Sequence, residues 1–118
     1  MRSHGAAAAQ LLNNRDLVNA VVTDLASSPL SEAEKALFEF LRKVNRASHS
    51  VTQADVDGVK GHGWSDEALY DAITVCALFN FYNRWCDATG VHPMPPEAHE
   101  MSGKRLAAHG YMMDMPSR

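Results

Sequence analysis

The sequence predicts an all-α protein, and three of its features carry that prediction. Apolar residues recur at helical spacing in several stretches, and capping residues mark where those stretches begin and end. No stretch alternates apolar and polar residues over enough positions to suggest a strand, and no internal repeat is present. We therefore expect a single domain over residues 1–118, with about five or six helices around one long buried helix at 65–89.

Three helices are expected in the first part of the chain. Residues 4–13 are alanine-rich and helix-prone until a pair of asparagines breaks them. Residues 16–26 carry leucine and valine at helical spacing and are closed by a Ser-Ser-Pro sequence. The third helix, 31–45, opens with a capping box in which Ser31 and Glu34 satisfy each other's backbone N–H groups.

The remaining helices are expected after residue 50. Thr52 marks the start of a short helix, which three glycines then weaken. The long helix begins at Ser65, a good N-cap, and ends at Gly90, which can take the left-handed backbone conformation. Pro96 suits the first position of a last helix, and the methionine-rich residues after it, 111–118, are expected to form a flexible tail.

The long helix is apolar over most of its circumference, which is typical of a helix in the interior of a protein. Leu69, Ile73 and Cys76 form one stripe. The opposite side carries a larger apolar set: Val75, Leu78, Phe79, Tyr82, Trp85 and Cys86. The helix is long enough to cross a bilayer, but five charged residues interrupt it too often, so we expect no membrane span.

Composition excludes several partners and compartments. The net charge of −3 and a pI near 6.0, with basic residues scattered along the chain, argue against nucleic-acid binding. The alanine run near the amino terminus is too short and too soon interrupted for a secretory signal, so we expect a cytoplasmic protein.

Cysteine and histidine spacing predicts no disulfide, no metal site and no cofactor. Cys76 and Cys86 are separated by about 15 Å along one helix, whereas a disulfide needs Cα atoms within about 7 Å. Of the six histidines, none has a histidine partner at the spacing of a known zinc motif.

Three polar residues of the long helix, Asn80, Asn83 and Arg84, lie on the same stripe as Leu69 and Ile73. They should therefore face packed protein or a cleft. In one interpretation Arg84 makes an ion pair or caps the carbonyls of a neighbouring helix, because buried polar groups must be satisfied. In the other, Asn80 and Arg84 line a pocket.

Residues 30–91 resemble the carboxyl-terminal half of the AhpD-like, peroxidase-related proteins of the alkylhydroperoxidase and carboxymuconolactone decarboxylase superfamily. The resemblance is carried by PLSEAEKALFEFLRKVNR, by SDEALYDAI after a glycine-containing loop, by FNFYNRW, and by the late RLAAHGY. It implies an all-helical fold that assembles as a homo-oligomer. It also implies a redox site in which a glutamate precedes a Cys-x-x-Cys pair that is followed by a histidine.

The chain departs from that pattern at the redox site. His4, followed by Gly5 and an alanine run, is similar to the family histidine, and the glutamate and both cysteines would then precede residue 1. We therefore expect a truncated or short-start member of the family that is inactive alone. A thiol peroxidase needs one thiolate to attack and a second thiol to resolve the sulfenic acid. The candidate catalytic residues that remain are His4, Asn80 and Arg84.

Three functions follow as alternatives. The first is an antioxidant thiol peroxidase of the AhpD-like kind, with a thiol reductant as partner if the whole protein carries the cysteine pair. The second is a non-catalytic helical module that works by oligomerising or by binding a partner. The third is a small-molecule enzyme related to carboxymuconolactone decarboxylase. In each case we expect a homo-oligomer, a dimer or larger, with the long helix near the interface.

Overall fold

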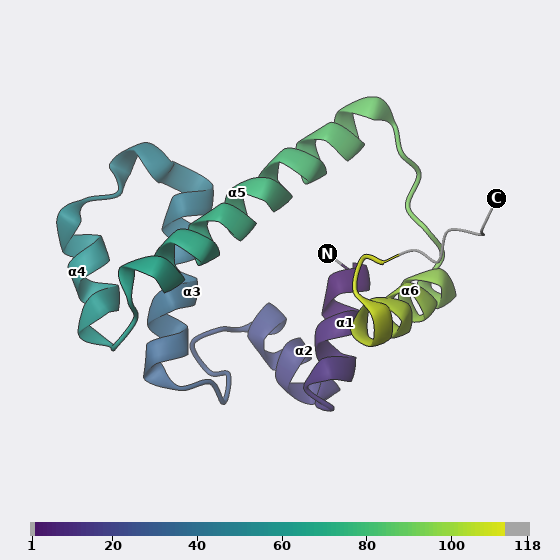
Figure 1. The fold of residues 1–118 in the computed structure, drawn as a ribbon, viewed down its shortest axis with the longest axis horizontal. Coiled ribbons are helices and arrows are strands. Elements are labelled where there is room, and N and C mark those ends of the chain that lie inside the picture. The colour runs from purple at the N-terminus through teal and green to yellow at the C-terminus, as the bar shows by residue number, and fades with distance from the viewer. Residues whose placement is uncertain (1, 113–118) are drawn as a thin grey trace. The chain divides into compact units, whose positions relative to one another are not determined.

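A computed structural model of the protein describes residues 2–112, apart from the side chain of Arg2. Within those residues every regular element is helical, which confirms the all-α class: six α-helices and one short 3₁₀ helix (Figure 1). The chain divides into two compact units. Unit 1 comprises residues 1–29 and 92–118, and unit 2 comprises residues 30–91. A single domain over 1–118 stays a prediction.

Unit 1 contains α1 (Arg2–Leu11), α2 (Arg15–Thr23) and α6 (Pro96–His109), and α1 packs against both of the others. The buried surface of α1 consists of alanines, at positions 6, 7 and 9. Gly103 of α6 is buried opposite them, and a Cβ added there would lie 2.5 Å from Ala6 Cβ. These small residues let the backbones of α1 and α6 approach closely.

Polar contacts also join α6 to the amino-terminal helices of unit 1. Ser3 Oγ lies 2.8 Å from His99 Nδ1, and this contact is partly buried. The guanidinium of Arg15 donates two hydrogen bonds to the carboxylate of Glu100, at 3.0 and 2.6 Å. The Arg15–Glu100 pair is half exposed, so it is worth about 1 kcal/mol or less.

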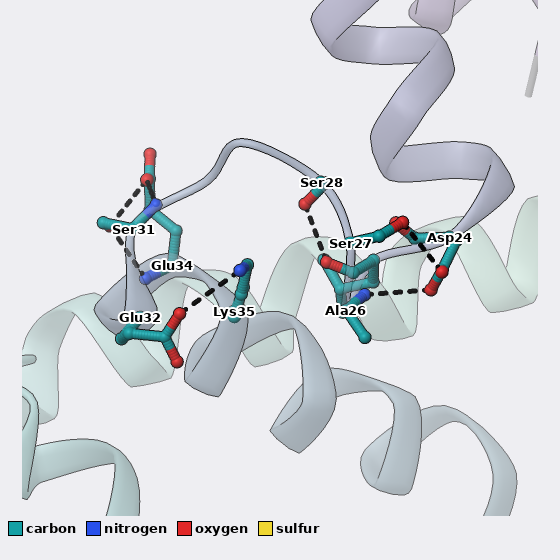
Figure 2. A network of polar contacts seen from close by, with 9 residues as sticks. Asp24, Ala26, Ser27, Ser28, Ser31, Glu32, Glu34 and Lys35 are labelled. Carbon is teal, nitrogen blue, oxygen red and sulfur yellow. Dashed lines mark hydrogen bonds and ion pairs between the residues drawn. The ribbon is translucent and has the colours of Figure 1, made fainter.

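Helix α2 ends at Thr23, three residues earlier than the sequence predicts. Asp24 takes an extended backbone conformation, with φ −152° and ψ 103°. Its carboxylate accepts hydrogen bonds from the Ala26 N–H at 3.1 Å and the Ser27 hydroxyl at 2.8 Å (Figure 2). The expected end at residue 26 is therefore wrong, because this local turn offers the backbone an alternative to another helical turn.

Unit 2 contains α3 (Glu32–Ala47), the 3₁₀ helix η1 (Ser48–Ser50), α4 (Gln53–Gly61) and α5 (Asp66–Thr89). Its core joins one buried residue from each α-helix: Phe40, Val59 and Leu69. A ring of partly buried apolar residues packs against that core: Leu37, Leu41, Val44, Val51, Val56, Trp64 and Ile73.

Three predicted helix termini of unit 2 are confirmed, whereas α3 continues to Ala47, two residues beyond its predicted end at 45. At the start of α3, Ser31 N–H donates to Glu34 Oε2 at 2.8 Å and Glu34 N–H donates to Ser31 Oγ at 3.3 Å (Figure 2). Ser65 Oγ accepts from the Ala68 N–H at 3.1 Å. Gly90 ends α5 in the left-handed conformation, with φ 72°, a value that glycine adopts without strain.

The long helix is intact, but the prediction that it is buried is wrong for its second half. Leu69 is its one buried residue, whereas Tyr82 and Trp85 remain 49 % and 54 % exposed. The reason is length: α3 has 16 residues, or about 24 Å, and α5 has 24 residues, or about 36 Å. Helix α5 therefore extends beyond the helices that cover its first half (Figure 1).

Asp55 should make the free energy of unfolding of unit 2 depend on pH in the acid range. Its carboxylate accepts hydrogen bonds from Lys43 Nζ at 2.7 and 2.8 Å, and from the N–H and hydroxyl of Thr52 at 2.7 and 2.8 Å. These bonds, that of Lys43 above all, lower the pKa of Asp55 from 3.8 to about 2. The stability that they add is fully present above pH 3.8 and is lost as the pH falls through about 2.

We therefore expect the free energy of unfolding of unit 2 to fall in this acid range, as measured by urea denaturation at a series of pH values. Asp55→Asn should flatten that dependence. Asp57→Asn, two residues away on α4, is the matched control and should retain it. An equal acid dependence in wild type and Asp55→Asn would contradict the assignment.

Candidate functional site

Asn80 and Arg84, two of the three candidate catalytic residues, contact each other on α5. Arg84 Nη1 donates to Asn80 Oδ1 at 2.6 Å and to the Asn80 backbone carbonyl at 3.1 Å. Asn80 Nδ2 in turn donates to the Cys76 carbonyl at 3.0 Å. The three residues thus form a row at intervals of four along one helix face.

This row does not perform the structural role that the sequence suggests for it. Arg84 is exposed, and its hydrogen bonds go to its own helix instead of to the carbonyls of a neighbouring helix or to a carboxylate. Asn80 is only partly buried, and Asn83 is exposed. The sequence predicts that Asn80, Asn83 and Arg84 face packed protein or a cleft. Asn83 and Arg84 do not face packed protein, because they lie beyond the part of α5 that packs against the core, whereas Asn80 is partly covered. A pocket role for Asn80 and Arg84 stays a prediction.

Replacing Arg84 by leucine should change the free energy of unfolding by less than about 0.5 kcal/mol, since water can replace the bonds of an exposed side chain. Thermal unfolding followed by circular dichroism measures the change. A buried guanidinium holding several helices together would instead lower the melting temperature markedly when it is removed. A loss above about 1 kcal/mol would show that the exposed placement of Arg84 is wrong.

Both cysteines are free and partly buried. Cys76 Sγ lies 4.0 Å from the Leu41 carbonyl of α3 and 3.7 Å from Asn80 Nδ2. Cys86 stands ten positions further along α5, which is about 15 Å along the helix axis. The two thiols therefore cannot form a disulfide with each other in the same α5 helix.

His4, the third candidate catalytic residue, belongs to unit 1 and has a partner there. Its Nε2 lies 2.7 Å from the Tyr111 hydroxyl, with the two ring centroids 6.2 Å apart. Partial burial lowers the pKa of His4 below 6.5, which favours the neutral imidazole at pH 7. A neutral imidazole beside a phenol can accept or relay a proton.

Tyr111 was not singled out in the sequence, where it opens the segment expected to be a flexible tail. Its hydroxyl contact with His4 ties the start of that segment to α1, and residues 113–118 lie outside the described part of the chain. The Ser3–His99 contact was missed for the same reason. These pairs are separated by 107 and 96 positions, and a sequence read alone carries no signal for contacts across such distances.

Across residues 2–112, no three histidine, cysteine, aspartate or glutamate side chains gather closely enough to hold a metal ion. None of the helices in that same range combines the length and the apolar character needed to cross a bilayer.

No family model matches the chain, and no curated protein matches it. The resemblance of residues 30–91 to AhpD-like proteins therefore stays a prediction.

Proposed function

We propose that this chain is a non-catalytic helical module, related to the AhpD-like peroxidase-related proteins, that works by associating with a second protein surface. The observation that carries the proposal is the exposed apolar side of α5. Five large side chains are about half exposed there: Val75 (54 %), Leu78 (47 %), Phe81 (60 %), Tyr82 (49 %) and Trp85 (54 %).

Isolated exposed apolar residues are ordinary, but several on one helix mark a site of interaction. Here they span three turns, and the rings of Phe81 and Tyr82 hold each other edge to face at 5.5 Å. Aromatic side chains of this kind supply large contact area at low entropic cost, because few of their bonds rotate. This arrangement favours association as the function.

The placement of the thiols supports the non-catalytic part of the proposal. Peroxide reduction by a cysteine pair requires a second thiol that can reach the sulfenic acid formed on the first. Cys76 and Cys86 are about 15 Å apart along one rigid helix, so neither can resolve the other within it. Two unbridged thiols also suit a reducing compartment such as the cytoplasm.

A second candidate function is antioxidant thiol-peroxidase chemistry of the AhpD-like kind. One observation favours it: His4, the counterpart of the family histidine, contacts the Tyr111 hydroxyl and has a pKa lowered by burial. A base of this kind could pass a proton to a thiol pair supplied by another segment or another protein, with a thiol reductant restoring the pair.

Two measurements on the purified chain test these functions. Static light scattering at micromolar concentration should give the mass of a dimer or a larger assembly, and a stable monomer would count against association. Hydroperoxide consumption with a dithiol reductant should equal the rate without protein. Turnover that disappears in the Cys76→Ser Cys86→Ser variant would refute the non-catalytic assignment.

A further inference from the structure

Four of the exposed apolar residues on α5 have the spacing of a helix-pairing surface. Val75, Leu78, Tyr82 and Trp85 follow one another at intervals of three, four and three residues. This is the 3-4 repeat that keeps apolar side chains facing a second helix over successive turns. We call these four residues the α5 seam.

The seam lies on the opposite side of α5 from the core of unit 2. At about 100° per residue, its four members fall within about 80° of one another, centred away from Leu69 and Ile73. Leu69 is buried in the core and Ile73 packs against it. The side of α5 that contacts the rest of unit 2 and the side that carries the seam are therefore different.

We propose that the seam binds a second copy of this chain, with the two α5 helices antiparallel. This inference rests on the proposed function and names the partner and its orientation. The evidence for this orientation is the order of side chains along the 3-4 repeat, including the next position at each end of the seam. Asp71 comes four residues before Val75, and Thr89 comes four residues after Trp85.

Antiparallel pairing fits this order of side chains, and parallel pairing does not. In a parallel pair each residue meets its own copy, so Asp71 would face Asp71 and Trp85 would face Trp85. The Asp71–Asp71 contact places like charges opposite each other. The Trp85–Trp85 contact puts two large side chains at the same level of the interface, where there is too little space for both. In an antiparallel pair Val75 meets Trp85 of the second copy and Leu78 meets Tyr82, so each layer combines a smaller side chain with a larger one.

The helix ends favour the same orientation. Asp66 and Glu67 lie in the first turn of α5, where a parallel pair would bring four carboxylates together. An antiparallel pair separates them by the length of the helix, about 36 Å for its 24 residues. It also opposes the two helix dipoles, which is the favourable arrangement.

The exposed area of the seam is that of a small symmetric interface. Fully covered aromatic side chains bury roughly 150–250 Å² each, so Tyr82 and Trp85, about half exposed, offer roughly 200 Å². Val75 and Leu78 add roughly 100 Å². Two copies would then bury roughly 600 Å² of apolar surface. With the usual polar share, this becomes an interface of roughly 900–1,100 Å², close to the roughly 1,000 Å² that a specific interface should reach.

Matched tyrosine variants on α5 test whether the seam forms the interface. Tyr82→Glu places a charge in the seam and should weaken the dimer about ten-fold or more in sedimentation equilibrium. Tyr70→Glu makes the same change on the same helix, at a position 71 % exposed and about a quarter turn away from the seam. It should leave the dissociation constant unchanged. Equal dissociation constants for wild type and Tyr82→Glu would overturn the proposal.

Cross-linking tests the orientation. In a Cys76→Ser Cys86→Ser background, Thr74→Cys and Ala88→Cys each place one thiol at an exposed position beside the seam. When the two proteins are mixed, a short bis-maleimide should join position 74 of one chain to position 88 of the other. Products that join only like positions would show a parallel dimer and overturn this inference, while association as the function would stand.

Wild-type protein that remains a monomer in solution would also decide the question. If wild type is a monomer in which iodide cannot quench Trp85, the chain itself covers the seam, and both this inference and the proposed association fail. Fluorescence of the Trp64→Phe variant isolates the Trp85 signal for that measurement.

Discussion

Replacing Phe40 by alanine should lower the free energy of unfolding of unit 2 by about 3–5 kcal/mol. Phe40 is only 5 % exposed and joins α3 to Val59 and Leu69. Its removal leaves a cavity where the three helices of the unit meet, so the loss includes both the buried apolar area and the cavity. Urea denaturation followed by tryptophan fluorescence measures it, because Trp64 packs against the same core and donates to the Ala33 carbonyl at 2.8 Å.

Phe38→Ala is the matched control for this measurement. Phe38 lies on the same helix, two residues earlier, and is 41 % exposed. Its truncation should cost less than about 1 kcal/mol, since much of the ring already faces water. Similar losses for the two variants would contradict the division between a buried and an exposed side of α3.

Replacing Gly103 by alanine should destabilise unit 1 by roughly 1–3 kcal/mol, although alanine favours helices. The added Cβ would lie 2.5 Å from Ala6 Cβ and 2.9 Å from both the Ala6 carbonyl carbon and the Ala7 nitrogen. Two of these atoms belong to the backbone of α1, so no side-chain rotation relieves the contact. The helices must move apart, and faster hydrogen exchange of the α1 amides should report it.

Gly58→Ala tests the same change where space is open. Gly58 lies within α4, and nothing stands within 4 Å of a Cβ added there. The substitution should therefore stabilise the protein by about 0.5–1 kcal/mol through helix propensity alone. We therefore expect the two glycine substitutions to change the free energy of unfolding in opposite directions. Stabilisation by both would mean that α1 and α6 are not in close contact.

Local chemistry explains why most of the fold could be predicted from the sequence. The caps at Ser31, Thr52 and Ser65 each involve a hydrogen bond between residues three positions apart, and Gly90 ends α5 through its own backbone freedom. All the residues that form such a cap lie within one helical turn of each other, so they can be recognised from a short stretch of sequence. The sequence does not predict the end of α2 correctly, because the Asp24 carboxylate accepts hydrogen bonds from Ala26 and Ser27, and that turn competes with a helical pattern that continues to residue 26.

The candidate site could be predicted less well, because side-chain partners depend on what surrounds them. Helical spacing correctly placed Asn80 and Arg84 on one face of α5. Helical spacing could not indicate that α3 ends before it reaches these two residues. As a result Arg84 is exposed to solvent, and its guanidinium donates to Asn80 on the same helix. The partner of His4 is Tyr111, which lies 107 positions away.

The sequence by itself determined the helical class, the helix ends marked by caps and the continuous length of α5, because these depend on bonds between residues at most a few positions apart. Only the tertiary structure decided which apolar faces are covered. That choice depends on the relative lengths of helices packed together, as with α3 and α5, and on close backbone approach, as at Gly103. The uncovered side of α5, on which the proposed function depends, is the direct consequence.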